Sequence, residues 1–139
     1  MNILVDTSVW SLALRRRRLI EAPEIAELAE LVREGRVSLL GPVRQELLSG
    51  ITEEKQYAVL RDHLRAFPDV ELDPGDYEDA AVFFNRCRSR GVQGSNTDFL
   101  ICATAARRQL GILTTDADFR HFAKLLPIHL HAPRATSAG

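Results

Sequence analysis

The chain has 139 residues, of which 45% are hydrophobic and 27% are charged; this composition suits one ordered soluble domain and excludes a disordered chain. The formal net charge of −1 excludes a general attraction to polyanions, and no apolar run approaches the roughly 18 residues of a membrane helix. The N-terminal apolar run ends at Asp6 with no basic region before it, so we expect no signal peptide and a cytoplasmic location.

Strand patterns alternate with helical patterns along the whole chain. From the N-terminus we expect a strand at 2–5, helices at 8–18 and 23–34, a strand at 37–40, a short helix that opens at 41–42 and closes at 49–50, a helix at 53–64 and a brief strand at 70–72. Helices at 75–90 and 97–109, a strand at 112–114, a helix at 117–125 and a strand at 128–130 follow.

This alternation predicts an α/β fold, as a three-layer α/β/α sandwich with a mainly parallel central sheet of four to five strands. We expect residues 1–132 to form one domain and residues 133–139 to form a flexible C-terminal tail. Cys87 and Cys102 lie among apolar neighbours in helical patterns, which predicts two reduced, buried thiols. The histidines do not combine with either cysteine at zinc spacing, and we expect His129 and His131 to be structural or on the surface.

Three groups of arginines interrupt the otherwise balanced charge pattern. They are Arg15–Arg18, Arg86 with Arg88 and Arg90, and Arg107 with Arg108. Such groups are either solvated helix faces or contacts for phosphate groups, and the pattern alone leaves both open.

Polar residues follow two predicted strands that should end at the same edge of the sheet, where open α/β sheets form their sites. Asp6 follows the first strand, and Thr114, Thr115 and Asp116 follow the strand at 112–114. Glu46 and Asp98 lie in helices that could project over this edge, so four carboxylates are candidates for one site.

Each acid also has a purely structural explanation. Asp6 and Asp116 could be N-caps, and Glu46 could lie on a solvated helix face. The stretches 95–98 and 115–118 each fit a capping box, with Asp98 at the last place of the first. The joint placement of all four favours a site.

Converging carboxylates repel one another, so they must take up protons or a cation. No lysine is near any of the four in sequence, and the nearest arginine is Arg44, two residues before Glu46. A hard divalent cation such as Mg²⁺ or Mn²⁺, which prefers oxygen ligands, is the expected partner.

Four stretches resemble, in order and spacing, the four motifs of PIN-domain nucleases, and in particular the VapC-type toxins of toxin–antitoxin modules. They are Val5–Trp10, Glu46–Gly50, Thr97–Ala103 and Leu113–Phe119. The resemblance covers nearly the whole chain and implies a metal-dependent endoribonuclease with one or two Mg²⁺ or Mn²⁺ ions. It also implies an RNA substrate, a VapB-type antitoxin that masks the site, and a homodimer.

The resemblance assigns roles residue by residue. The acids at Asp6, Glu46, Asp98 and Asp116 would line one pocket and hold metal. We expect Asp6, Asp98 and Asp116 to bind the metal directly and Glu46 to complete the site and orient the attacking water, leaving a 5′ phosphate and a 3′ hydroxyl. The accessory positions are Thr7 and Thr114, which match hydroxyl residues near the metal or the scissile phosphate, and Asp118, which matches an additional acid.

Other interpretations stay open at this point. The Arg15, Arg16, Arg17 and Arg18 run, or the cluster from Arg86 to Arg90, could contact RNA phosphates beyond the cut site. A non-catalytic PIN-fold module that binds RNA or metal is one alternative. An aspartate-dependent phosphatase is another, although Ser8 stands where such enzymes have a second aspartate and Lys124 is poorly placed. Trp10, Phe83 and Phe84 could belong either to a contact surface or to the core.

Overall fold

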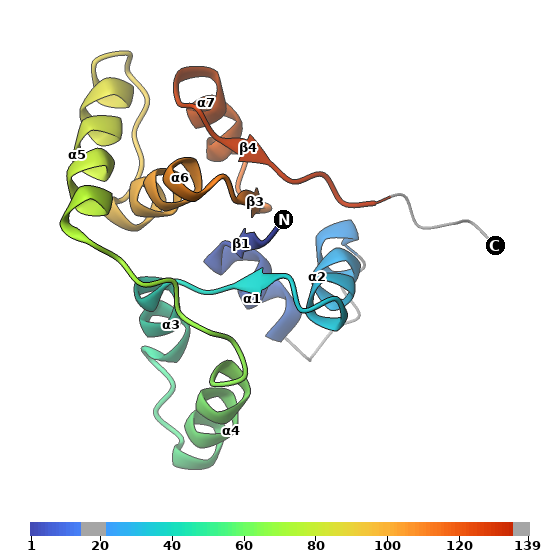
Figure 1. Cartoon of the computed structure of the whole chain (residues 1–139). Helices are drawn as coiled ribbons and strands as arrows, with labels where there is room; N and C mark the ends of the chain where they lie inside the picture. The colour runs from blue at the N-terminus through green and yellow to red at the C-terminus, as the bar shows by residue number, and fades with distance from the viewer. Residues whose placement is uncertain (15–21, 135–139) are drawn as a thin grey trace.

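A parallel sheet of four strands lies at the centre of the molecule. The structure is a computed structural model that describes residues 1–14 and 22–134. The strands β1 (Ile3–Val5), β2 (Val37–Ser38), β3 (Gly111–Leu113) and β4 (His129–Leu130) are arranged in the order β2-β1-β3-β4. Every described pairing in the sheet is parallel, which confirms the predicted sheet (Figure 1).

Helices connect the strands and cover both faces of the sheet. The helices are α1 (Thr7–Leu14), α2 (Pro23–Arg33), α3 (Gly41–Leu48), α4 (Glu54–Leu64), α5 (Pro74–Arg88), α6 (Asn96–Arg108) and α7 (Asp118–Leu125). In Figure 1, α5 and α6 lie on one side of the sheet and α2 lies on the other, as the predicted α/β/α sandwich requires. None of the helices in the described ranges has the length and apolar character that a membrane crossing requires.

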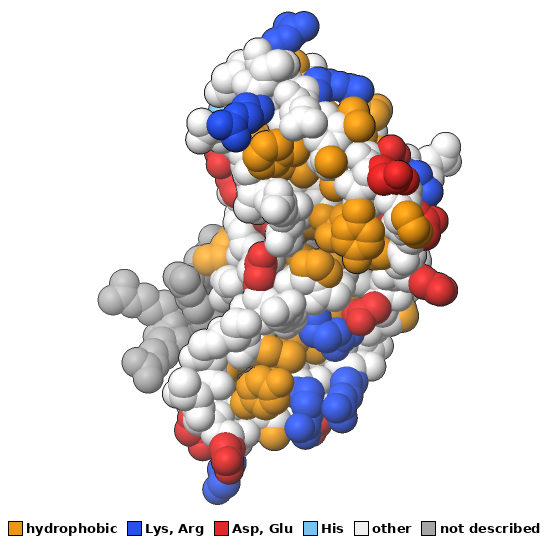
Figure 2. Space-filling view, turned by 90° about the vertical axis from the view of Figure 1, so that its left-hand side faces the viewer, with side chains coloured by type: hydrophobic (Ala, Val, Ile, Leu, Met, Phe, Trp, Pro, Cys, Tyr) orange, Lys and Arg blue, Asp and Glu red, His pale blue; other side chains and the backbone are white. Residues whose placement is uncertain are grey.

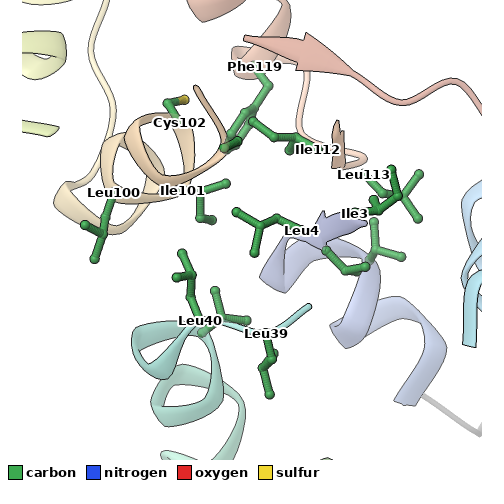
Figure 3. Close-up of a cluster of buried hydrophobic side chains, with 14 of the residues drawn as sticks. Ile3, Leu4, Leu39, Leu40, Leu100, Ile101, Cys102, Ile112, Leu113 and Phe119 are labelled. Carbon is green, nitrogen blue, oxygen red and sulfur yellow. The ribbon is translucent and has the colours of Figure 1, made fainter. Parts of the chain in front are cut away.

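The core forms where the short central strands meet the inner faces of the helices. Ile3, Leu4 and Val5 are all buried, as is usual for a parallel strand covered on both faces. Ile101 of α6 and Phe119 of α7 belong to the same cluster of buried side chains (Figure 3). This packing fixes the end of β1, and with it the backbone at Asp6.

Capping and ion pairs hold the N-terminal end of α5 to the C-terminal end of α6. The side chain of Asp73 accepts the backbone N–H of Asp76, and that of Asp76 accepts the backbone N–H of Asp73, so that α5 begins with a capping box. Asp76 is fully buried and also accepts hydrogen bonds from Arg108 at the end of α6. Because α5 packs along α6, this cluster fixes the helix that carries Asp98.

The predicted strand at 70–72 is wrong. The structure has only an isolated parallel bridge there, between Leu39 and Asp69. Val70 donates its N–H to the carbonyl of Leu39, but Pro68 has no N–H to offer, and Asp73 already caps the next helix. The segment is therefore too short for a ladder to extend.

The structure shows how far the two cysteines and three aromatic residues singled out from the sequence are buried. Cys87 and Cys102 are both buried and unpaired, as expected. Trp10 and Phe83 are buried, so their place is the core, whereas Phe84 is half-buried beside Phe99.

The end of the described chain is attached to α2. The buried carboxylate of Glu27 contacts the His131 ring and accepts from the Nε of Arg134 at 3.0 Å, and Arg134 also pairs with Glu34. His131 therefore has a structural role. The predicted tail at 133–139 extends beyond this contact, and residues 135–139 lie outside the described part, as do the last residues of the predicted helix 8–18. The division of the chain at residue 132 stays a prediction.

Candidate active site at the carboxyl edge of the sheet

Asp6 lies at the point where β1 ends beside β3. The backbone N–H of Asp6 donates to the carbonyl of Leu113, which extends the parallel pairing by one residue. Its side chain is only 5% exposed, and one carboxylate oxygen, Oδ2, accepts hydrogen bonds from the hydroxyls of Ser8 and Thr114, each at 2.8 Å. These hydroxyls satisfy the buried carboxylate and fix its orientation without neutralising its charge.

The loop after β3 places Asp116 next to this carboxylate. The Thr114 hydroxyl accepts the backbone N–H of Asp116 at 3.0 Å, while the Ser8 hydroxyl accepts the N–H of Thr115 at 3.1 Å. Asp116 in turn accepts the N–H of Asp118 through Oδ1 at 2.9 Å. The predicted capping box at 115–118 is therefore wrong, because Asp116 takes the N–H that Thr115 was expected to accept.

Asp98 lies in the first turn of α6, where the predicted capping box at 95–98 is confirmed. Its Oδ2 accepts the backbone N–H of Ser95 at 3.0 Å, and the Ser95 hydroxyl accepts the N–H of Asp98 at 3.1 Å. Burial raises the pKa of Asp98, and the charges of Asp6 and Asp116 raise it further, although the hydrogen bonds from Ser95 oppose this. The capping role and the electrostatic coupling to the other acids thus coexist in one residue.

Glu46 reaches the site from α3, on a face of the helix that is open to water. Its side chain is exposed, and its Oε2 accepts the hydroxyl of Thr7 at 2.8 Å. Thr7 directly follows Asp6, so this hydrogen bond joins α3 to the end of β1. Asp118, the predicted accessory acid, is also exposed and contacts Asp116 through its backbone N–H.

The four acids have one property in common. In the described ranges, their recorded hydrogen-bond donors are hydroxyls and backbone N–H groups only. Arg44, which lies two residues before Glu46, is directed to Asp69 and to the carbonyl of Phe67. Within residues 1–14 and 22–134, no basic side chain therefore compensates the charge of these acids.

The donor set fits a hard divalent cation in its chemistry, since carboxylate and hydroxyl oxygens are the ligands that Mg²⁺ and Mn²⁺ prefer. Within the described residues, no group of three or more His, Cys, Asp or Glu side chains is gathered closely enough to form a complete metal-binding cluster. Mg²⁺ does not need such a cluster, because it usually keeps several waters and is held by one or two carboxylates.

One hydroxyl of the site was missed by sequence reasoning. Ser8 donates to Asp6 and accepts from Thr115, so it connects the ends of β1 and β3. Its position two residues after a strand-end aspartate, beside the predicted accessory Thr7, was the available signal. Of the arginine groups, Arg15–Arg18 lies outside the described residues, while Arg107 and Arg108 pair with Asp76 and have a structural role.

Comparison with known proteins agrees with this geometry. Residues 3–125 match the family model described as PIN domain. "Ribonuclease VapC11" of Mycobacterium tuberculosis and "VapC ribonuclease Mb1587" of Mycobacterium bovis are each 30% identical over 125 residues, which cover 88% of this chain and 92% of the relative.

Solved structures share the fold at lower identity. VapBC2 from Rickettsia felis, in complex with a DNA fragment from its promoter, superposes with a TM-score of 0.74 at 15% identity and covers 94% of this chain and 98% of its own. FitAcB from Neisseria gonorrhoeae gives a TM-score of 0.69 at 23% identity, with 94% and 97% covered. The chain therefore belongs to the PIN domain family, among its VapC-type members.

Proposed function

We propose that this chain is a metal-dependent endoribonuclease and the toxin of a toxin–antitoxin module, which cleaves RNA and thereby inhibits translation and growth. The observation that carries the proposal is the set of four acids that are held by neutral donors and that pair with no basic side chain of the described residues. The names of the curated relatives, which are ribonucleases, support the same activity.

Asp6, Asp98 and Asp116 are the proposed metal ligands. Bound Mg²⁺ or Mn²⁺, as one or two ions, would supply an activated water and neutralise the phosphate and the leaving oxygen. Asp6 is held in place by Ser8 and Thr114, and Asp98 by its capping box, so both carboxylates are oriented before any ligand arrives. Preorganised ligands of this kind lose little conformational entropy when a cation binds.

Glu46 has a different environment and a different proposed role. It is exposed and held by Thr7 at the rim, where it can accept a hydrogen bond from the attacking water and orient it. In-line displacement of the 3′ oxygen leaves a 5′ phosphate and a 3′ hydroxyl. Asp118 and the hydroxyls of Thr7 and Thr114 have supporting roles, since they contact the acids and not the reacting atoms.

The proposed partners follow from the family. VapBC2 of Rickettsia felis and FitAB were solved bound to DNA fragments, and we propose that this chain likewise assembles with a VapB-type antitoxin that masks its site. A cytoplasmic location, a homodimer and RNA contacts from one of the arginine groups complete the proposal.

Cleavage by the purified chain tests the activity directly. Labelled RNA incubated with Mg²⁺ or Mn²⁺ should be cut internally, and EDTA should stop the reaction. Asp6→Asn and Asp98→Asn should lose most of the cleavage, whereas Asp62→Asn, an exposed acid on α4, should cut as fast as the unchanged protein. Equal rates in all three variants would refute the assignment.

A binding measurement separates the alternatives. Isothermal titration with Mn²⁺ should show binding to the unchanged chain and much weaker binding to Asp6→Asn. If metal binds and no RNA is cut, the chain is a non-catalytic module. If phosphate becomes covalently attached to Asp6 with a phosphate ester as substrate, the chain is an aspartate-dependent phosphatase.

A further inference from the structure

Basic side chains without an ion-pair partner gather at one end of the molecule. Apart from Lys55 on α4, every lysine and arginine that forms no ion pair within residues 1–14 and 22–134 lies there, and each is exposed. By contrast, Arg61 of α4 and Arg65 directly after this helix both contact Asp62. The unpaired side chains belong to the C-terminal end of α5, to the turn after it and to α7: Arg86, Arg88, Arg90, Arg120 and Lys124.

The sequence around these side chains contains no acid that could compensate them locally. No Asp or Glu occurs between Asp79 and Asp98, and none follows Asp118 in the sequence. In Figure 2, Lys and Arg side chains lie at the top of the molecule, where Figure 1 shows the C-terminal end of α5 and helix α7. The formal net charge of −1 therefore conceals a local excess of positive charge at this end.

Arg86 joins the end of α5 to the end of α7. Its Nη1 donates to the backbone carbonyl of Leu125 at 3.5 Å, and its guanidinium lies over the ring of Phe83, 5.5 Å from the ring centroid. Both partners are neutral. They hold the guanidinium beside the C-terminal end of α7, and they do not compensate its charge.

Helix α7 turns its basic residues away from the core. Phe122 is fully buried, whereas Arg120 and Lys124, which are one helical turn apart, are exposed. The helix begins at Asp118, whose backbone N–H donates to Asp116. Lys124 lies six residues beyond Asp118, or about 9 Å along the helix axis. The basic side of α7 therefore leads away from the acidic site.

The loop after α5, at residues 91–95, connects this helix to a second acid of the site. At the end of the loop, the Ser95 hydroxyl accepts the N–H of Asp98. The loop packs directly on α7, because a Cβ added to Gly94 would lie 2.6 Å from the ring of Phe122. The end of α5, the loop and α7 thus form one continuous surface that adjoins the acidic site.

The α5–α7 basic surface comprises Arg86, Arg90, Arg120 and Lys124. We propose that it binds the phosphates of an RNA strand beside the bond that the acidic site cleaves. The inference rests on the proposed function and names the part of the chain that holds the substrate. Acids repel a polyanion, so basic groups next to them supply the attraction. Arg88 is left out, because side chains two residues apart on a helix face different ways.

An acidic protein segment is the other occupant that the charge alone would allow. RNA fits better because the surface is continuous with the acids, where a bound cation would attract a phosphate as well. A strand with phosphates repeated along its length occupies both places at once, whereas an acidic segment needs only the basic surface. The position of the surface next to the acids is therefore explained by RNA.

RNA binding in the absence of metal tests the surface. A fluorescein-labelled single-stranded RNA of mixed sequence is titrated with the full chain in EDTA at about 50 mM salt, and its anisotropy is followed. Arg120→Ala combined with Lys124→Ala should raise the dissociation constant at least about tenfold. Arg61→Ala combined with Arg65→Ala is the matched control, because these arginines have the same spacing and both contact Asp62. The control should change the constant less than about twofold.

Further measurements separate the effect of charge from that of structure. The slope of log affinity against log salt should be smaller by about 0.7 for each cation removed, because fewer counterions are released from a single strand. Arg86→Ala combined with Arg90→Ala should weaken binding and reduce the slope in the same way. Arg120→Lys combined with Lys124→Arg keeps both charges and should bind RNA like the unchanged chain. Circular dichroism should show every variant folded, since the altered side chains lie on the surface.

Several outcomes would overturn the proposal. They are an unchanged chain that binds no RNA, an unchanged affinity when Arg120 and Lys124 become alanine, and an equal loss in the control on α4. If this α7 variant lost affinity for poly-glutamate and not for RNA, the surface would belong to an acidic protein instead. EDTA prevents metal-dependent cleavage, so the measurement does not depend on activity. A chain that binds RNA through this surface and never cuts it would refute the proposed function alone.

Discussion

Replacement of Asp76 by asparagine should be one of the most destabilising single changes outside the apolar core. The Asp76 side chain is fully buried. Its carboxylate accepts the N–H of Asp73 and the Nη2 of Arg108, each at 2.8 Å, and forms an ion pair with Arg107, whose Nε lies 3.0 Å away. One carboxylate thus closes the capping box of α5 and binds two guanidinium groups at the end of α6.

The magnitude follows from what asparagine leaves unpaired. An amide keeps one acceptor oxygen, but its NH₂ group would face the guanidinium of Arg108, so a donor would meet a donor. Removal of one partner from a buried charged cluster costs about 3–5 kcal/mol. The total stability of a domain is about 5–15 kcal/mol, so Asp76→Asn should remove a large part of it.

Urea unfolding followed by circular dichroism measures this cost, with an unchanged m-value expected. Asp79→Asn is the matched control. Asp79 contacts the same Arg107 at 3.4 Å, but its side chain is 45% exposed, so the change should cost about 0–1 kcal/mol. If Asp76→Asn cost no more than Asp79→Asn, the cluster would contribute little and the reasoning would fail.

The same cluster predicts how stability depends on pH. The two guanidinium groups, Arg108 above all, hold the pKa of Asp76 below its ordinary value. Its contribution is therefore complete above the pKa of an unfolded aspartate and is lost as the pH falls through the lower, folded value. The difference in stability between the unchanged chain and Asp76→Asn should accordingly shrink in strong acid, and a constant difference down to the acid transition would contradict this.

Four further predictions concern the edge of the sheet and helix α6. Thr114→Val removes the hydroxyl that orients Asp6 and accepts the N–H of Asp116, so kcat/KM for RNA should fall by about 10–100-fold with the fold intact. The raised pKa of Asp98 means that Mn²⁺ affinity should weaken as the pH falls through it, and calorimetric affinities that stay constant to about pH 4 would contradict this. Because an ionised group with a raised pKa opposes folding, Asp98→Asn should raise the urea midpoint of the metal-free chain at neutral pH. Burial raises the pKa of Cys102, so this thiol should resist alkylation at neutral pH until the chain unfolds.

Much of the fold was predictable because its signals are local. Helix starts and ends depend on nearby residues, such as Ser95 before α6, and the structure places them within a few residues of the expected positions. The strand expected at 70–72 depended on something else. A strand needs a neighbour with free backbone groups along its length, and only Leu39 offers a pairing there. Whether a segment finds such a neighbour depends on the arrangement of the sheet, and the three residues 70–72 alone do not reveal it.

The positions of the acids of the candidate site could be predicted from the sequence, whereas most of the hydrogen-bond donors that hold them could not. The position of Asp6 and Asp116 follows from parallel strands that end at one edge, so strand prediction was sufficient. The hydrogen bond that Ser8 accepts from Thr115 joins residues more than one hundred positions apart, and sequence spacing does not reveal it. The exposure of Glu46 also depends on how α3 packs, which its sequence pattern left undecided.

The partners of each acid distinguish the structural carboxylates of this chain from those proposed to bind metal. Glu27 and Asp76 are buried and bound by arginine, and their pKa values are lowered, so their charge is already compensated by the fold. Asp6 is almost equally buried, yet its hydrogen-bond donors among the described residues are the hydroxyls of Ser8 and Thr114, and its charge contributes to raising the pKa of Asp98. A fold that leaves such repulsion in place gives up stability there, and a bound cation would recover it. Mn²⁺ should therefore raise the thermal stability of the chain by binding at this site, and it should not bind at the clusters around Glu27 and Asp76.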